Sequence, residues 1–152
     1  MNYLFDARTL SHYVVNRCTV MGQPISNLQL QKILYFLQFF YCRANKGGAL
    51  LFPEPFYAWP YGPVIPDVYE EFSEFGGRAI EKSFTVELCC DQHVKDFLDE
   101  GIDTLREKSP WYLVRISHAQ GLPWSLIYRD GDGYKDIIPN SLIIKAACAG
   151  VA

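Results

Sequence analysis

One stretch of the sequence limits the possible folds more than any other, because residues 26–41 are apolar on almost every side of a helix. Its first residues, Ser26-Asn27-Leu28-Gln29, match a capping box. In this motif the serine hydroxyl accepts from the backbone N–H of Gln29, and the glutamine side chain reaches back to the backbone N–H of the serine. The apolar residues at helical spacing are Leu30, Ile33, Leu34, Leu37 and Tyr41, with Leu28, Phe36, Phe39 and Phe40 on other faces. A helix that is apolar nearly all round is normally buried, so the sequence predicts a buried central helix.

Helical spacing and capping signals predict about six helices around this central one. They are expected after Asp6, from Pro66, after Asp91, from Pro110, at Pro123–Tyr128 and at Leu142–Cys148. In the helix from Pro66, Tyr69 is expected on the inner face and Glu71 on the outer face. With 152 residues, nearly half of them apolar, the chain fits one compact domain covering residues 1–152.

Strands are expected to be few and short. The composition of Phe56–Trp59 is typical of a strand, but the prolines around it, Pro53, Pro55 and Pro60, argue against a central strand. The imperfect alternation of Arg78–Leu88 predicts a short edge strand. The fold class predicted is therefore mainly α, with one or two short β strands.

Charge and composition argue against several classes of protein. The net charge is −3 and the lysines and arginines are scattered, so the basic stripe typical of nucleic-acid binding is missing. The first six residues do not resemble a secretory signal, and the apolar stretch Ile33–Tyr41 is too short to cross a bilayer. Five cysteines, an odd number without framework spacing, indicate reduced thiols. We expect a cytoplasmic protein that binds neither nucleic acid nor membrane.

No residue pattern predicts a metal or catalytic centre. Cys89, Cys90 and His93 lie close together, but adjacent cysteines rarely face one metal and there is no CxxC pair. The segment Asp130–Asp136 lacks most ligands of a calcium loop and is expected to be a turn. Without a GxSxG elbow or a phosphate-binding glycine loop, neither an enzyme nor a cofactor is expected. The alternative is an enzyme that uses His118 with a cysteine or hydroxyl.

Three short motifs follow one another along the chain. They are LQKILYF at residues 30–36, AWPYGPVIP at residues 58–66, and Ser117-His118 followed by Pro123-Trp124. Their order and spacing resemble the Panacea antitoxin domain family, also described as SocA-like or phage-associated proteins, whose motifs read LQKLLYY, AWxxGPVxP and THxxxxPW. The sequence departs from that pattern with Ser117 in place of threonine and with Leu37 where a small residue is common. The match spans roughly residues 10 to 148.

The resemblance implies an antitoxin of a toxin–antitoxin system, often carried by phages or mobile elements, that neutralises a cognate toxin by direct protein–protein binding. SocA-like relatives are proteolytic adaptors, so a Clp-type protease is a further expected partner. Some relatives also carry an appended helix-turn-helix, which this chain lacks, so no direct contact with nucleic acid is expected. The alternatives are a phage-associated regulatory protein without a toxin partner and an enzyme of unknown chemistry.

The second motif supplies part of a candidate partner-binding site, made of Trp59, Tyr61, Gly62 and Pro63. Glycine–proline pairs are common in turns, so these residues could simply build a rigid turn, with Trp59 packed on the central helix. Alternatively, they form a proline-braced aromatic ledge for a partner, because tyrosine and tryptophan dominate the binding energy of interfaces. The sequence leaves both interpretations open.

The first and third motifs supply the other candidate residues. Lys32 lies on an otherwise apolar helix, where its side chain either extends past the core to the surface or pairs with a partner carboxylate. Tyr35 lies one turn further along, and His118 and Trp124 are expected to close a small polar pocket with Lys32. The apolar segment Leu142–Ala152 either completes the core or binds a partner.

Overall fold

The computed structural model describes residues 2–149, which form seven α-helices, two 3-10 helices and five short strands. The helices are α1 (Ala7–Val20), α2 (Asn27–Ala44), α3 (Pro66–Glu71), α4 (Gln92–Arg106), α5 (Pro110–Ser117), α6 (Pro123–Tyr128), α7 (Asn140–Cys148), η1 (Ser73–Phe75) and η2 (Arg129–Gly131). The strands are β1 (Asn2–Tyr3), β2 (Ala49–Leu50), β3 (Phe56–Trp59), β4 (Gly62–Val64) and β5 (Ile137–Ile138). The predicted mainly α fold is confirmed. The end of the apolar C-terminal segment, residues 150–152, lies outside the described residues.

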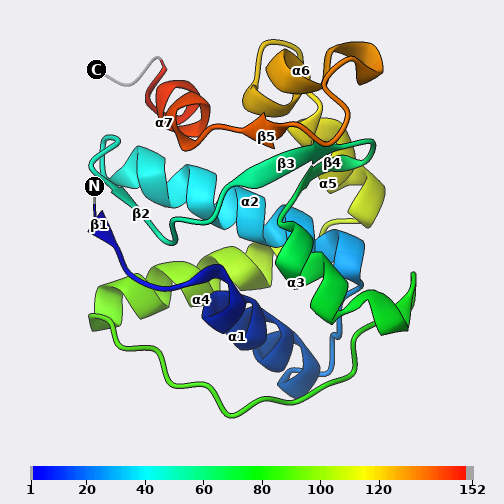
Figure 1. The fold of residues 1–152 in the computed structure, drawn as a ribbon. Helices are drawn as coiled ribbons and strands as arrows, with labels where there is room; N and C mark the ends of the chain where they lie inside the picture. Colours follow the sequence, from blue (N-terminus) through cyan, green and yellow to red (C-terminus); the bar gives the residue numbers. More distant parts are fainter. Residues whose placement is uncertain (1, 150–152) are drawn as a thin grey trace.

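Helix α2 runs through the middle of the protein, as predicted. Helices α1 and α4 lie against one side of it, α5, α7 and β4 lie against the other, and α6 packs on β3 and β5 (Figure 1). The predicted capping box is present: the Ser26 hydroxyl accepts from the Gln29 backbone N–H at 3.2 Å, and the Gln29 side chain accepts from the Ser26 backbone N–H at 3.1 Å. Thirteen of the eighteen residues of α2 are buried. None of the helices in residues 2–149 is long and apolar enough to span a membrane.

The prediction that Phe56–Trp59 is not a central strand is wrong, because β3 lies between β4 and β5 in a three-stranded antiparallel sheet. The flanking prolines fall just outside the four paired residues, so they remove no hydrogen bond from β3. Pro63 lies in the edge strand β4 opposite Ala58. Ala58 bonds the other side of the sheet instead, donating to the Asp136 carbonyl at 2.8 Å and accepting from the Lys135 N–H at 2.7 Å.

The predicted strand at Arg78–Leu88 is also wrong, because this segment forms an irregular strap along α1. Figure 1 shows it in green, passing under α1 from the end of η1 to the start of α4. Its backbone bonds mostly to loops and side chains: Ile80 N–H donates to the Ile25 carbonyl at 2.7 Å, and Phe84 N–H donates to Asn16 Oδ1 at 2.9 Å. The Phe84 ring stacks on His12 with centroids 3.9 Å apart. These partners are distant in sequence, so alternation alone does not reveal them.

Helix α4 packs against α2 at Gly101. A Cβ atom at that position would lie 2.7 Å from Cδ2 of Leu37, which is buried. Leu37 is the residue at which the family resemblance predicts a small side chain. The missing side chain of Gly101 therefore accommodates the larger leucine on the facing helix.

Candidate functional site

The three sequence motifs meet in a buried junction between α2, β4 and α5. Lys32 is completely buried, and its Nζ donates to the Pro63 carbonyl at 3.0 Å. Gly62 has a φ of +113°, and a Cβ atom there would lie 2.6 Å from Lys32 Cε and 2.7 Å from the Ser117 hydroxyl. Glycine is therefore required at position 62, both for its backbone conformation and for the approach of two side chains. We call Lys32, Gly62, Pro63 and Ser117 the motif junction.

Lys32 does not extend to the surface, so that interpretation is wrong. The Pro63 carbonyl lies within its reach inside the protein and takes the place of a solvent contact. Burial, which disfavours the charged ammonium, lowers the pKa of Lys32 to about 7. Tyr35 is also buried, with its ring edge-to-face with Phe56 at 5.3 Å, and burial raises the pKa of its hydroxyl above the ordinary value. Lys32 and Tyr35 are therefore both part of the buried interior that stabilises the fold.

His118 and Trp124 lie together beside the motif junction, stacked with ring centroids 3.6 Å apart and planes within 2° of parallel. The indole N–H of Trp124 donates to the Trp59 carbonyl at 2.8 Å, which ties α6 to the end of β3. Burial, and then the nearby charge of Lys32, hold the pKa of His118 below its ordinary value. The predicted grouping of His118 and Trp124 with Lys32 is thus found as a packed brace and not as an open pocket.

Sequence reasoning missed Gln31, which precedes Lys32 and is fully buried. Its side-chain oxygen accepts from the Ile65 N–H at 2.9 Å, and its amide donates to Asn27 Oδ1 at 3.1 Å. Asn27 in turn donates to the Tyr69 carbonyl at 3.0 Å. This chain of bonds fixes the start of α3 against α2. The available signal was a pair of amides one helical turn apart on an otherwise apolar helix.

An exposed surface adjoins the motif junction. Four aromatic side chains, Trp59, Tyr61, Tyr69 and Trp111, line a groove of about 480 Å³ that Pro60 and Pro110 border. Tyr61 and Trp111 are 58% and 60% exposed. We call this surface the aromatic groove. It supports the ledge interpretation for Trp59 and Tyr61, while Gly62 and Pro63 form the rigid turn beneath.

The sequence predicts other roles for two of the groove residues. Tyr69 is expected on the inner face of α3, but the residue is 36% exposed. Trp111 is expected in the fifth helix without a role in binding. Both side chains face outward because α3 and α5 pack on the core through other residues, including Val68 and Val114. Only the packing of these two short helices decides which aromatic rings remain uncovered.

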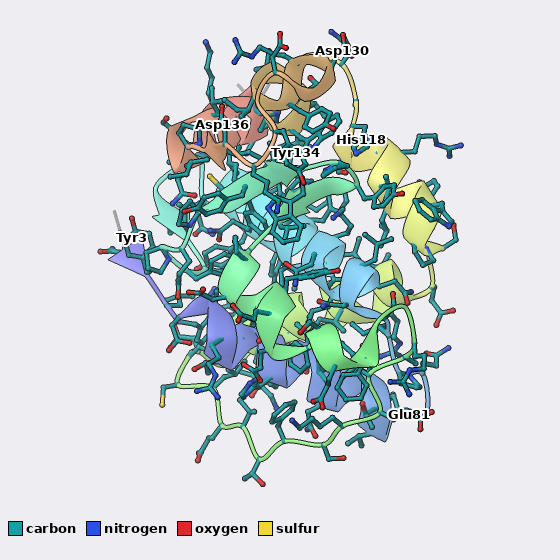
Figure 2. All side chains as sticks on the ribbon, turned by 45° about the vertical axis from the view of Figure 1, so that its right-hand side comes forward. Tyr3, Glu81, His118, Asp130, Tyr134 and Asp136 are labelled. Atoms are coloured by element: carbon teal, nitrogen blue, oxygen red, sulfur yellow. The ribbon has the colours of Figure 1, made fainter. Side chains whose placement is uncertain are left out.

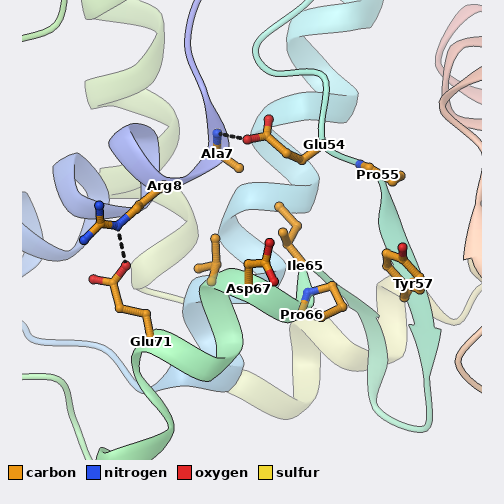
Figure 3. Close-up of a pocket in the computed structure, with 10 residues that line it drawn as sticks. Ala7, Arg8, Glu54, Pro55, Tyr57, Ile65, Pro66, Asp67 and Glu71 are labelled. Carbon is orange, nitrogen blue, oxygen red and sulfur yellow. Dashed lines mark hydrogen bonds and ion pairs between the residues drawn. The ribbon is translucent and has the colours of Figure 1, made fainter.

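A second pocket, of about 450 Å³, lies between α1 and α3 (Figure 3). Glu71, expected to point into solvent, accepts instead from Arg8 at 2.9 Å and pairs with His12 at 2.6 Å. Burial alone would raise the pKa of Glu71, but the bonds from Arg8 and His12 hold it below its usual value. Glu54 accepts from the Ala7 N–H at 3.1 Å at the start of α1. These contacts join α1 to α3 and to the loop before β3.

Metal-binding side chains do not gather within residues 2–149, where no group of three or more His, Cys, Asp or Glu residues is suited to hold an ion. The segment Asp130–Asp136 begins in the 3-10 helix η2 and continues as a turn, and Figure 2 shows Asp130 and Asp136 apart from each other. The Ser117 hydroxyl donates to the Val114 carbonyl at 2.8 Å and not to His118.

Comparison with known proteins gives the family of the chain. A family model described as "Antitoxin SocA-like, Panacea domain" matches residues 30–125. "Antitoxin SocA" of Caulobacter vibrioides (strain NA1000 / CB15N) is 35% identical over 133 residues, covering 80% of this chain and 70% of that relative. The chain belongs to the SocA-like Panacea antitoxin family. The matched Panacea segment contains the whole motif junction and all four aromatic residues of the groove. No solved structure matches the chain.

Proposed function

We propose that this Panacea antitoxin neutralises a cognate toxin in the cytoplasm by binding it directly through the aromatic groove. The observation that carries the proposal is the gathering of four large aromatic side chains in one groove, two of them more than half exposed. A concentration of exposed aromatic surface is typical of protein-binding sites. Neutralisation by binding requires neither turnover nor a cofactor, and the whole chain acts as one domain.

The motif junction supports this role because it fixes the groove before the toxin arrives. Trp59 and Tyr61 belong to the hairpin of β3 and β4, whose turn is held by the buried contacts of Gly62 and Pro63. Trp124 holds the Trp59 backbone from the other side. A surface that is already rigid loses little conformational entropy on binding, so more of the contact energy contributes to affinity.

Replacing both exposed groove aromatics, with Tyr61→Ala and Trp111→Ala, is expected to weaken the complex about thirtyfold or more and to abolish rescue of growth. Loss of one binding hot spot costs about 2 kcal/mol, which corresponds to about thirtyfold in affinity. The measurements are growth on co-expression with a toxic reading frame found next to this gene, and titration of the purified toxin with the antitoxin. Since both side chains are exposed, the thermal unfolding midpoint should stay close to that of the wild type.

Tyr112→Ala is the matched control, because Tyr112 is the neighbour of Trp111 on α5 and is 38% exposed without lining the groove. It should retain rescue and affinity. Full rescue and unchanged affinity in the double variant would contradict the groove as the binding site. Rescue without any detectable complex would favour the enzymatic alternative, and absence of any toxic neighbour would favour the regulatory one.

Delivery of the toxin to a Clp-type protease is the second part of the proposal, and it is carried by the resemblance to SocA-like adaptors. The expected result is a shorter half-life of the toxin when the antitoxin is present, restored in cells that lack the protease. A toxin half-life that is independent of the antitoxin, in cells whose growth is rescued, would leave direct binding as the complete mechanism.

A further inference from the structure

The pocket between α1 and α3 adjoins the face of the protein that carries the aromatic groove. In β3, Tyr57 and Trp59 are partly exposed and alternate with buried residues, so both side chains lie on the same face of the sheet. Trp59 lines the aromatic groove, and Tyr57 lines the pocket. Helix α3 likewise contributes Tyr69 to the groove and Asp67 to the pocket. A partner of ordinary interface size that covers the groove therefore also meets the pocket.

This pocket has a net negative charge. Its charged side chains are the carboxylates of Glu54, Asp67 and Glu71 and the guanidinium of Arg8, which together give a net charge of −2. The charge of Arg8 is matched by Glu71, with Nε 2.9 Å from Oε1. Figure 3 shows that pair at one side of the pocket and the carboxylates of Glu54 and Asp67 apart from it. We call this site the acidic pocket. It repels an anion and attracts a cation.

The two carboxylates away from Arg8 are poorly compensated. Within residues 2–149, neither Glu54 nor Asp67 takes part in an ion pair. Glu54 accepts from the Ala7 N–H through Oε2, while its Oε1 is buried without a hydrogen-bond partner among the described residues. A buried acceptor without a donor is rare in folded proteins and unfavourable. A positive charge in the acidic pocket would offset the charge of both carboxylates.

The apolar walls of the acidic pocket select among cations. The apolar part of its lining comes mainly from Pro55, Tyr57, Ile65, Pro66 and Val68. A hydrated metal ion would gain nothing from these walls. The stem of a lysine or arginine side chain, in contrast, buries its methylene groups against such surface while its charged end reaches the carboxylates. The volume of about 450 Å³ admits a side chain of that size.

We infer that a lysine or arginine side chain of the toxin enters the acidic pocket when the toxin covers the aromatic groove. The inference rests on the proposed function and adds a second contact of stated charge. The ammonium or guanidinium group donates to the Asp67 carboxylate, and the stem packs on Tyr57 and Pro66. A charge contact of this kind mainly selects the partner and speeds its association.

The test measures the affinity of the purified toxin for charge variants of the full chain. Asp67→Lys is expected to weaken the complex about tenfold or more, because two positive charges then face each other. Asp67→Asn, which keeps the shape of the side chain, is expected to weaken it less. Glu81→Lys is the control, because Glu81 is exposed and lines neither the groove nor the acidic pocket. It brings the same change of net charge and should leave the affinity nearly unchanged.

A charge swap identifies the residue that enters. Each lysine and arginine of the toxin is replaced in turn by glutamate, and one of these toxin variants should bind Asp67→Lys more tightly than the unchanged toxin does. Because Asp67 is exposed, the thermal midpoints of its variants should stay close to that of the wild type. Wild-type affinity in Asp67→Lys, equal weakening by Glu81→Lys, or the absence of any restoring toxin variant would overturn the inference.

The results also separate the inference from the proposed function. If the Tyr61→Ala and Trp111→Ala double variant loses the complex while Asp67→Lys keeps it, the groove stands and the acidic pocket is not a toxin contact. If Asp67→Lys loses the complex, the charge swap restores it and the double variant keeps it, the basic contact stands and the groove is wrong. If the wild-type chain binds no toxin, both fail.

Discussion

Gly62→Ala is expected to lower the free energy of unfolding by about 3 kcal/mol or more, and the thermal midpoint by about 6–12 °C. Two costs add at this position. The φ of +113° is unfavourable for any residue with a Cβ atom, and that atom would lie 2.6 Å from Lys32 and 2.7 Å from Ser117. Neither neighbour can move freely, because both are buried and hydrogen-bonded. Urea and thermal denaturation measure the loss.

Substitutions at two other glycines allow the backbone cost and the packing cost to be measured separately. Gly121 has a φ of +82°, and a Cβ atom there would meet no neighbour within 4 Å, so Gly121→Ala carries the backbone cost alone. Gly77 has equally open surroundings and no positive φ, so Gly77→Ala should be close to neutral. The expected order of destabilisation is Gly62→Ala, then Gly121→Ala, then Gly77→Ala. If Gly62→Ala costs no more than Gly121→Ala, the packing of the motif junction does not require a glycine.

Lys32→Met is expected to remove a rise of stability with pH that the wild-type protein shows above neutral pH. The pKa of Lys32 is about 7 in the folded protein and about 10.4 in the unfolded chain. Between these values the unfolded chain binds more protons, so raising the pH stabilises the folded state. From pH 7 to pH 9, the stability of the wild type relative to Lys32→Met should increase by about 2 kcal/mol.

Urea denaturation over this pH range measures the effect, and the difference between the two proteins removes the contribution of the groups they share. Lys145→Met is the matched control, because Lys145 is exposed on α7. It should leave the wild-type pH dependence unchanged. Parallel pH profiles for the wild type and Lys32→Met would show that the Lys32 ammonium is solvated in the native state, contrary to its complete burial.

Much of the local structure could be read from the sequence because the signals are local. The capping box of Ser26 and Gln29, followed by an apolar run, was enough to place α2 at the centre. Pro110 and Pro123 mark the first turns of α5 and α6 as expected. The two wrong strand predictions concern pairing between segments far apart in the chain. Strand β3 is central because it pairs with β5, and the backbone N–H and carbonyl of Ala58 bond to residues just before β5. The Arg78–Leu88 strap is held by hydrogen bonds to α1 and to the loop before α2.

In the candidate site, too, local sequence signals could be read from the sequence and long-range contacts could not. The three motifs and their order identified the family and most of the important residues, including Lys32, Gly62 and Trp124. Whether a motif residue is internal or exposed depended on what lies opposite in space: a carbonyl of β4 accepts from the buried Lys32 ammonium, while Tyr61 remains 58% exposed. Sequence alone determined the helices and the motifs, because capping and periodicity act within one or two turns. Only the tertiary structure decided that the motifs form a buried junction under an aromatic groove, because that division depends on contacts between segments far apart in the chain.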